Sequence, residues 1–336
     1  MSNVSLSYIV PVCNTRDYVL RCLQSLLDQG IPANEFEIIL VDDGSTDGSL
    51  AILQAFAQEH RQSVKLLTQG NAGVSAARNA AIEAASGDYV QFVDSDDFLA
   101  PGIMASLLQR AVEMNLDAMV FNYQPIAADG NPMPLKHGDE AQSTALMTGV
   151  EYLDSHVATP YIWRFLIRRE FLNRQQLRFD PSLIVCEDGD LIVRLLLAAS
   201  RVAHDSSVPY RYVKRDGSAM HNQDKQHLLK RIFSQVDSAA SISATIARYE
   251  AQQGKPAPKS VAGLRNVYLY FSMTKALTTG LVDSVLPRII QHALYPFPCV
   301  GPEAGYHGMK WRAIHAAMMH PHLWRFLSRV YRLIKS

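Results

Sequence analysis

The chain is poor in cysteine and lacks the sequence marks of several common protein classes. Its 336 residues include four cysteines, without a CxxC pair or a metal-like spacing to histidine: Cys13, Cys22, Cys186 and Cys299. A chain of this length needs no disulfide framework, so we expect free thiols in a reducing compartment. The G-x-G-x-x-G, Walker A, G-x-S-x-G and H-E-x-x-H patterns are also absent. Dinucleotide oxidoreductases, P-loop proteins and hydrolases are disfavoured accordingly.

Long apolar runs are missing as well. No stretch approaches the roughly 18 uninterrupted apolar residues that a spanning helix needs, so we predict no such helix. Met1–Val12 lacks a basic n-region and a long apolar h-region, and it is typical of a strand rather than of a signal peptide. We therefore expect the protein to be cytoplasmic.

The formal net charge is zero, but the charges are unevenly distributed along the chain. The 32 basic side chains match the 32 acidic ones, yet residues 1–200 carry 13 basic against 25 acidic side chains, and residues 201–336 carry 19 against 7. Such asymmetry indicates two halves with different tasks. With 48% hydrophobic and 19% charged residues the composition is typical of globular proteins, and we expect no nucleic-acid partner.

Apolar patterns of strand and helix type alternate through the first 120 residues. The predicted strands are 6–12, 36–41, 64–68, 89–93 and 117–123, and the predicted helices are 17–29, 49–59, 74–85 and 101–115. This alternation predicts an α/β fold in which helices cover both faces of a parallel sheet.

The pattern changes after residue 123. Glycine and proline in residues 124–160 predict loops, and later segments predict strands over 161–169 and 208–213 and a helix over 188–200. From about residue 222 the pattern is helical, over 225–252, 259–280, 283–294 and 310–335. We therefore predict two domains, residues 1–220 and residues 221–336.

Polar clusters follow three of the predicted strands, where ligands of parallel sheets bind. Asn14 follows the first, Asp42 and Asp43 the second, and Asp94–Asp97 the fourth. Carboxylates packed at a strand end repel one another unless a cation is present, and Mg²⁺ or Mn²⁺ commonly bridges carboxylates to substrate phosphates. The alternative is a solvated helix N-terminus, where acidic side chains interact well with the helix dipole.

Four segments occur together in order and at compatible spacing. They are YIVPVCN (8–14), ILVDDGSTDG (39–48), NAGVSAARN (71–79) and FVDSDD (92–97). Over residues 5–123 the chain thereby resembles the family 2 glycosyltransferases of GT-A fold. The resemblance implies a Rossmann-like α/β domain with a mainly parallel sheet flanked by helices, followed here by an α-helical C-terminal extension. It also implies inverting transfer from a nucleotide sugar, usually UDP-linked, in bacterial-type polysaccharide or cell-envelope biosynthesis.

The resemblance assigns donor-binding roles residue by residue. Pro11, Val12 and Asn14 match the segment that frames the nucleotide base, although the family often has an aromatic residue where this chain has Cys13. Asp42 matches the acid that bonds the uracil or its ribose. Gly73 and Arg78 match the segment that lines the nucleotide and its pyrophosphate.

The FVDSDD segment matches the metal motif of the family. Asp94 and Asp96 correspond to its acidic pair and are the expected residues for Mn²⁺ or Mg²⁺, with Asp96 in direct contact; Asp94 and Ser95 are also expected at the donor. Arg78 has two roles that are compatible, a bond to phosphate and an ion pair with one of these carboxylates.

CEDGD (186–190) resembles the segment of the family that supplies the catalytic base. Asp188 is the expected base, beside Glu187, because inversion by single displacement needs a group that takes the acceptor proton. The alternative is that these acids only cap the helix that follows.

Further candidates lie around this segment. Trp163 is expected either to stack on a sugar of the acceptor or to lie in the core. The segment 210–221 resembles the part of the family that closes the catalytic domain, and Arg215, Ser218 and His221 are its candidates for reaching the pyrophosphate, a plain surface turn being the alternative.

The C-terminal end is basic and amphipathic. No acid follows Glu303, whereas six basic residues do, and the apolar residues of 323–335 share one helical face. This pattern favours peripheral contact with the inner face of a membrane, and the alternative is a helix packed on the protein itself.

The sequence therefore predicts metal-assisted transfer of a hexosyl or N-acetylhexosaminyl group to a hydroxyl of a glycan or lipid-linked acceptor. Two alternatives stay open. One is a catalytically silent protein that binds nucleotide sugars or serves as a scaffold, and the other is a nucleotidyl or phosphosugar transferase with a similar acidic site.

Overall fold

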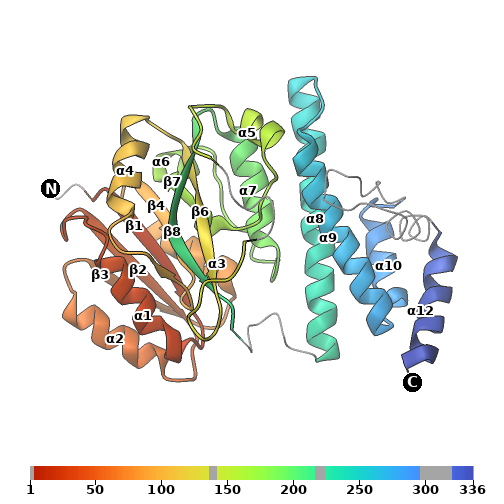
Figure 1. The fold of residues 1–336 in the computed structure, drawn as a ribbon. Coiled ribbons are helices and arrows are strands. Elements are labelled where there is room, and N and C mark those ends of the chain that lie inside the picture. The colour runs from red at the N-terminus through yellow and green to blue at the C-terminus, as the bar shows by residue number, and fades with distance from the viewer. Residues whose placement is uncertain (1–3, 136–141, 216–223, 296–319, 336) are drawn as a thin grey trace. The chain divides into compact units, whose positions relative to one another are not determined.

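The computed structural model describes residues 4–135, 142–215, 224–295 and 320–335, which form two compact units (Figure 1). The first unit comprises Met1–Tyr152, Tyr161–Pro181 and Ala198–Ser218, and the second comprises Leu153–Pro160, Ser182–Leu197 and Ala219–Ser336. The predicted division at residue 220 is a single cut in the sequence. In space, two earlier segments group with the C-terminal helices, so Glu187 and Asp188 belong to the helical unit.

The first unit is built on one eight-stranded sheet. Its strands are β1 Leu6–Val12, β2 Phe36–Asp43, β3 Val64–Gln69, β4 Tyr89–Phe92, β5 Phe98–Leu99, β6 Ala118–Ile126, β7 Phe165–Arg168 and β8 Val202–Val213. Their order is β3-β2-β1-β4-β7-β6-β8-β5. The pairs among β3, β2, β1 and β4 are parallel, as is β6 with β8, whereas β7 runs antiparallel to both of its neighbours. The α/β fold is confirmed, with a mixed, mostly parallel sheet.

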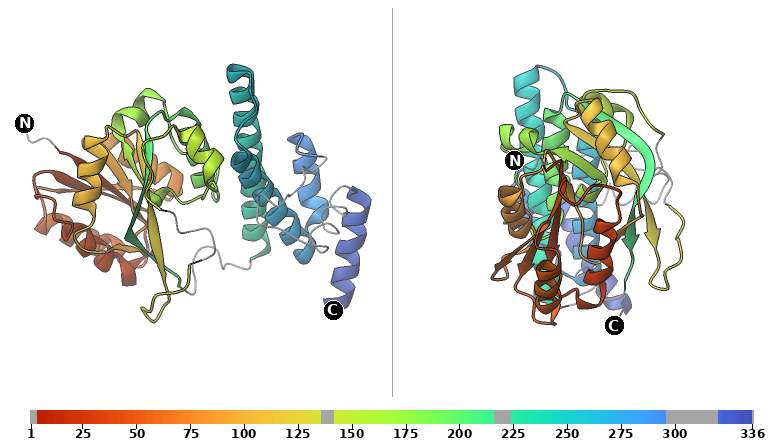
Figure 2. Two further views of the ribbon diagram at one scale, coloured as in Figure 1. Left: turned by 45° about the horizontal axis from the view of Figure 1, so that its top comes forward. Right: turned by 90° about the vertical axis from the view of Figure 1, so that its left-hand side faces the viewer.

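Helices flank this sheet (Figures 1 and 2). They are α1 Arg16–Leu27, α2 Ser49–Glu59, α3 Val74–Ala84 and α4 Met104–Glu113, with shorter α5 Gly149–Ser155, η1 Ile162–Arg164 and α6 Arg169–Arg174. β1 and β2 are buried at every position, as strands covered on both faces require. The predicted helix 101–115 begins only at Met104, because Pro101 and Gly102 form a turn in which Gly102 has a positive φ of 73°.

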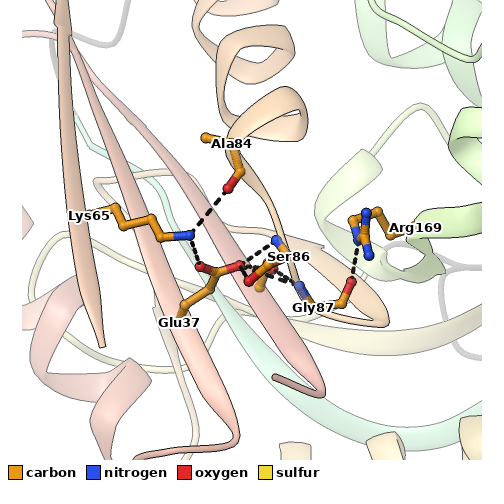
Figure 3. A network of polar contacts seen from close by, with 7 residues as sticks. Glu37, Lys65, Ala84, Ser86, Gly87 and Arg169 are labelled. Carbon is orange, nitrogen blue, oxygen red and sulfur yellow. Dashed lines mark hydrogen bonds and ion pairs between the residues drawn. The ribbon is translucent and has the colours of Figure 1, made fainter. Parts of the chain in front are cut away.

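A buried carboxylate fastens the amino-terminal edge of the sheet (Figure 3). Glu37 of β2 accepts hydrogen bonds from Ser7 Oγ at 2.6 Å and from Ser86 N at 2.6 Å, and it pairs with Lys65 Nζ at 2.6 Å. Gly87 belongs to the same junction, because a Cβ added there would lie 2.6 Å from the backbone nitrogen of Ser7. These contacts join the starts of β1, β2 and β4, at the edge opposite to the polar clusters.

The second unit is helical. Its helices are α7 Glu187–Ala198, α8 Lys225–Gln253, α9 Lys259–Thr279, α10 Val282–Gln291 and α12 Pro321–Lys335. α8 and α9 lie side by side, and α10 and α12 pack against α9 (Figure 1). The turn between α8 and α9 begins at Gly254, whose φ of +65° ends α8. The helices predicted over 225–252, 259–280 and 283–294 are confirmed; of the predicted helix 310–335, residues 310–319 lie outside the described residues.

α12 has one packed face and one exposed face. Trp324 and Ser328 are each 2% exposed, whereas Phe326 is 61% exposed. Arg325 pairs with Asp283 of α10 at 2.9 Å. Among the described residues, no helix combines the length and the apolarity that crossing a membrane requires.

Candidate functional site

Asn14 joins two loops at the carboxyl edge of the sheet. Its Oδ1 accepts from Thr46 N at 2.8 Å, and its own N–H donates to Ser45 Oγ at 3.2 Å. The side chain stays exposed on a residue with a left-handed φ of 54°, a conformation that asparagine tolerates better than most residues. Pro11 and Val12 are buried in β1, so Cys13 and Asn14 are the exposed members of the predicted base-framing segment.

Asp42 and Asp43 end the same strand but do different things. Asp42 is 3% exposed; its Oδ2 accepts from Ser45 N at 3.3 Å, and its Oδ1 is buried without a partner among the described residues. A buried carboxylate oxygen without a donor is costly, so Asp42 is suited to receive a hydrogen bond from a ligand. The nucleoside contact expected for Asp42 therefore stays a prediction, and the vacant Oδ1 is compatible with it.

Asp43 holds the loop between β3 and α3. Its Oδ1 accepts from Ala72 N at 2.7 Å and from Gln69 Nε2 at 2.8 Å, and its Oδ2 accepts from Gly73 N at 2.9 Å. Gly73 has a φ of +88° and caps α3, so the predicted pyrophosphate segment is positioned from β2. This role of Asp43 is not predictable from the sequence, where its only signal is its place beside Asp42.

Arg78 forms an ion pair with a carboxylate of the acidic loop, one of the two roles expected for it. Its Nη2 lies 2.9 Å from Oδ1 of Asp94, and its guanidinium lies over the ring of Phe179. Arg78 is 3% exposed, while the side chain of Asp94 is 30% exposed. The arginine therefore supports Asp94 from the protein interior, and a bond from it to phosphate stays a prediction.

Asp96 forms an ion pair with an arginine 119 positions later in the sequence. Arg215 Nε lies 2.7 Å from Asp96 Oδ2, and the guanidinium also lies over the ring of Tyr18. Burial and the neighbouring Asp94 raise the pKa of Asp96, against the opposing effect of Arg215. The structure thus joins a predicted metal ligand to a predicted loop residue. Ser218 and His221, the companions of Arg215 in that prediction, lie outside the described residues.

Asp97 and Ser95 hold the acidic loop in place. Asp97 is 1% exposed and accepts from Tyr210 Oη at 2.8 Å and from Val213 N at 2.7 Å. Burial, followed by the charges of Asp96 and Asp94, raises its pKa well above the ordinary range. Ser95 is 5% exposed, and its Oγ accepts a hydrogen bond from Thr15 Oγ1 at 2.9 Å. This bond holds the loop in position, and the expected contact of Ser95 with the sugar donor stays a prediction.

The donor set of this loop suits a hard divalent cation. Asp94 and Asp96 offer carboxylate oxygens, and burial together with the neighbouring Asp94 charge raises the pKa of Asp96. In the part of the chain that the structure describes, no group of three or more His, Cys, Asp or Glu side chains is set to hold an ion. A cation here needs further ligands, such as the phosphate oxygens of a donor.

Trp163 is a core residue. It is 3% exposed, and its ring stacks on Tyr210 with centroids 4.2 Å apart and on Tyr161 with centroids 5.0 Å apart. Of the two alternatives expected for Trp163, stacking on an acceptor sugar does not fit the structure, because neighbouring tyrosines cover the ring. The core alternative fits the structure.

Glu187 and Asp188 form the first turn of α7 in the helical unit, and both are partly buried. The residue before them, Cys186, has a positive φ of 65°. Ser234 and Ser238 of α8 form hydrogen bonds with the backbone of this segment, contacts that no local sequence pattern predicts. The sequence shows only the spacing of Ser234, Ser238 and Ser241 on one face of a predicted helix.

The chain is similar to known proteins. The model of the family described as Glycosyl transferase family 2 matches residues 7–175. The chain belongs to this family. The glycosyltransferase YibD of Escherichia coli (strain K12) is 31% identical over 239 residues, which are 68% of this chain and 67% of YibD. The family predicted from four short segments is confirmed.

Further relatives of the family are longer proteins. The poly(ribitol-phosphate) beta-glucosyltransferase of Bacillus spizizenii is 29% identical over 65% of this chain and 33% of its own length. The poly(ribitol-phosphate) beta-N-acetylglucosaminyltransferase TarS of Staphylococcus aureus is 28% identical over 65% of this chain, and the match spans 37% of TarS.

A solved structure shares the fold. Residues 1–349 of S. aureus TarS in complex with UDP-GlcNAc superimpose with a TM-score of 0.70 at 21% identity, covering 98% of this chain and 92% of that one. At this identity the likeness concerns the fold alone, and it agrees with a GT-A sheet followed by helices.

Proposed function

We propose that the protein transfers a hexosyl or N-acetylhexosaminyl group from a UDP-linked donor to a hydroxyl of a glycan or lipid-linked acceptor, with inversion. The observation that carries the proposal is the vacant, buried Oδ1 of Asp42 on the same sheet edge as Asp94 and Asp96. Membership of the family supports glycosyl transfer, and the names of two relatives, a glucosyltransferase and an N-acetylglucosaminyltransferase, favour UDP-glucose or UDP-N-acetylglucosamine as first donors to test.

The donor side is assigned to the first unit. Asp42 Oδ1 accepts an N–H or O–H of the nucleoside, beside the exposed Asn14. Asp94 and Asp96 would hold Mn²⁺ or Mg²⁺ at the donor diphosphate. When bound, the cation neutralises the charge that develops on the leaving diphosphate. Arg78 keeps Asp94 in position, and Arg215 is assigned to exchange its ion pair with Asp96 for a contact with phosphate when the donor binds.

The base is assigned to Asp188, with Glu187 beside it. Its carboxylate takes the proton of the acceptor hydroxyl as the hydroxyl oxygen forms a bond to the anomeric carbon. The bond from that carbon to the diphosphate breaks in the same step, and its electron pair leaves with the UDP. One displacement of this kind inverts the anomeric configuration.

Two measurements test the proposal. Calorimetric titration of UDP-glucose and UDP-N-acetylglucosamine with and without Mn²⁺ tests donor binding, and Asp96→Ala should weaken the metal-dependent part. Turnover of the donor then tests catalysis: Asp188→Asn should keep donor affinity and lose transfer, while the exposed Asp154→Asn should match the wild type. Transfer by Asp188→Asn at the wild-type rate would refute the base assignment. Donor binding without turnover by the wild type would instead favour the silent alternative, and nucleotide transfer to a phosphosugar would favour the other.

We also propose peripheral contact of α12 with an anionic membrane on its inner face. Phe326 and Leu323 are exposed on this helix, and Arg329 is exposed beside them. Flotation with phosphatidylserine vesicles tests this proposal. Phe326→Glu should reduce flotation, whereas the same change at the exposed Phe271 of α9 should not; equal flotation of the wild type and Phe326→Glu would reject α12 as the anchor.

A further inference from the structure

A row of serines on α8 bonds the segment that carries the proposed base. Ser234, Ser238 and Ser241 are spaced by four and three residues, so they lie on one face of the helix. Every one of them bonds a residue between Ile184 and Asp190. Segment and helix belong to the same compact unit.

Ser234 ties down the loop before α7. Its Oγ accepts from Ile184 N at 2.9 Å and from Val185 N at 3.1 Å, and its O–H donates to Val185 O at 2.9 Å. A serine hydroxyl offers one donor and two acceptor positions, so all three are used on this loop. The loop has no regular secondary structure of its own, and Ser234 is 3% exposed. One side chain thus satisfies backbone groups that strand or helix partners would otherwise satisfy.

Ser238 holds the turn into the helix. Its Oγ donates to the carbonyl oxygen of Cys186 at 3.0 Å, and Ser238 is fully buried. Cys186 has a φ of +65°, a conformation that residues other than glycine adopt at a cost and that surrounding contacts must maintain. Glu187 and Asp188 directly follow this turn. Its backbone conformation therefore determines the position of their two carboxylates.

Ser241 completes the row from within the helix. Its Oγ donates to Asp190 Oδ1 at 2.5 Å, and Arg194 donates to the other oxygen at 2.7 Å. Asp190 is 2% exposed, so it anchors the first turn of α7 instead of serving as an exposed acid. Packing adds a second constraint, since a Cβ at Gly189 would lie 2.1 Å from Tyr268 Oη of α9.

We propose that Ser234, Ser238 and Ser241 are positioning residues that set the geometry of Asp188. The proposal rests on the proposed function, in which Asp188 is the base. A general base works only within hydrogen-bond reach of its proton, and displacements of about 1 Å are enough to lose rate. The C-terminal helices therefore act as the template on which the base segment is folded, and the helical extension takes part in catalysis through that segment.

The test combines three serine-to-alanine variants with a matched control on the same helix. Ser243 has an Oγ that is buried without a partner among the described residues, so Ser243→Ala removes a hydroxyl of the same kind outside the row. We expect Ser238→Ala and Ser241→Ala to lower kcat at least tenfold, with the KM for the donor within twofold of the wild type. Ser243→Ala should match the wild type, and Ser241→Thr, which keeps the hydroxyl, should restore most of the rate.

Hydrogen exchange supplies a readout that does not depend on activity. The amides of Ile184 and Val185 should exchange faster in Ser234→Ala than in Ser243→Ala, while strands of the first unit keep their protection. Wild-type kcat in both Ser238→Ala and Ser241→Ala would overturn the proposal when Asp188→Asn is inactive. If Asp188→Asn keeps full activity, the base assignment fails first and the positioning role falls with it. If Ser238→Ala does not fold, the kcat of Ser241→Ala alone decides, because Ser241 is the least buried of the three serines.

Discussion

Arg215 Nε lies 2.7 Å from Asp96 Oδ2, so the proposed metal ligand is held by a cation of the protein itself. The two residues are 119 positions apart, and their side chains are 19% and 23% exposed. Arg215 lies two residues after the end of β8, at the last position that the structure describes before residue 224. A metal ion that binds Asp96 has to compete with this guanidinium.

Removing the competing charge should strengthen metal binding in the absence of nucleotide. We expect Arg215→Gln to raise the affinity for Mn²⁺ by about fivefold, the equivalent of ~1 kcal/mol for a partly exposed ion pair. Titration of Mn²⁺ followed by electron paramagnetic resonance measures the change. Arg61→Gln, at an exposed position on the opposite edge, is the control. A lower affinity in Arg215→Gln would mean that Arg215 orients Asp96 for the metal instead of competing with it.

Substitution of Asp42 should lower the affinity for the nucleotide, whereas substitution of Asp43 should lower the stability of the fold. Asp42→Ala removes the vacant acceptor, so affinity for UDP should fall about ten- to a hundredfold, in line with ~1.5–3 kcal/mol for a hydrogen bond to a charged group. Asp43→Ala removes the buried carboxylate that accepts from the amides of Ala72 and Gly73, so the free energy of unfolding should fall by about 1–3 kcal/mol. Calorimetry with UDP and denaturant unfolding measure the two effects. The reverse pattern would exchange the two roles.

Glu37 should make the free energy of unfolding depend on pH. Burial alone would raise its pKa, but hydrogen bonds from Lys65, Ser7 and Ser86 outweigh it, so the folded-state pKa is lowered. A group with a lowered pKa stabilises the fold above its unfolded value of about 4.3, and this contribution is lost as the pH falls through the folded pKa. Glu37→Gln should therefore be less stable at pH 7, by about 1–2 kcal/mol.

The difference between Glu37→Gln and the wild type should shrink as the pH falls below about 4. Urea unfolding at several pH values measures it, with the exposed Glu59→Gln as the control. A difference that stays constant down to pH 3 would show that packing around Glu37, and not its charge, supplies the stability.

Trp163 should matter for stability and not for the acceptor. Trp163→Ala removes a ring that stacks between tyrosines, so we expect a loss of about 3–5 kcal/mol in the free energy of unfolding. Trp163→Phe should be milder and should leave the KM for the acceptor unchanged. Phe271→Ala, at a ring that is 48% exposed, is the control for a surface aromatic. A raised acceptor KM in a stably folded Trp163→Phe would return the residue to the acceptor site.

The parallel part of the sheet could be predicted because each strand is a short apolar run that ends in polar residues. The strands predicted over 6–12 and 36–41 appear as Leu6–Val12 and Phe36–Asp43. β7 was less predictable, since the predicted strand 161–169 is shortened to four residues by η1. Its antiparallel place between β4 and β6 depends on pairing partners that are distant in the sequence, and local patterns carry no record of them.

The role of each acid depended on partners that only the fold brings near. Asp96 and Asp97 are neighbours in the sequence, yet Asp97 is buried against Tyr210 and Val213, which lie more than 110 positions away, while Asp96 stays partly exposed. The same holds for Asp188, whose segment is bonded by serines about 50 positions further along the chain.

The sequence by itself determined the family, the α/β class and the places where acids gather, because these follow from local periodicity and from residue types at strand ends. The tertiary structure decided which acid keeps a vacant oxygen, which arginine pairs with which carboxylate, and that Trp163 lies in the core. It also decided that the proposed base is carried by the helical unit. Burial and hydrogen bonding depend on contacts between distant segments, so the order of residues alone does not determine them.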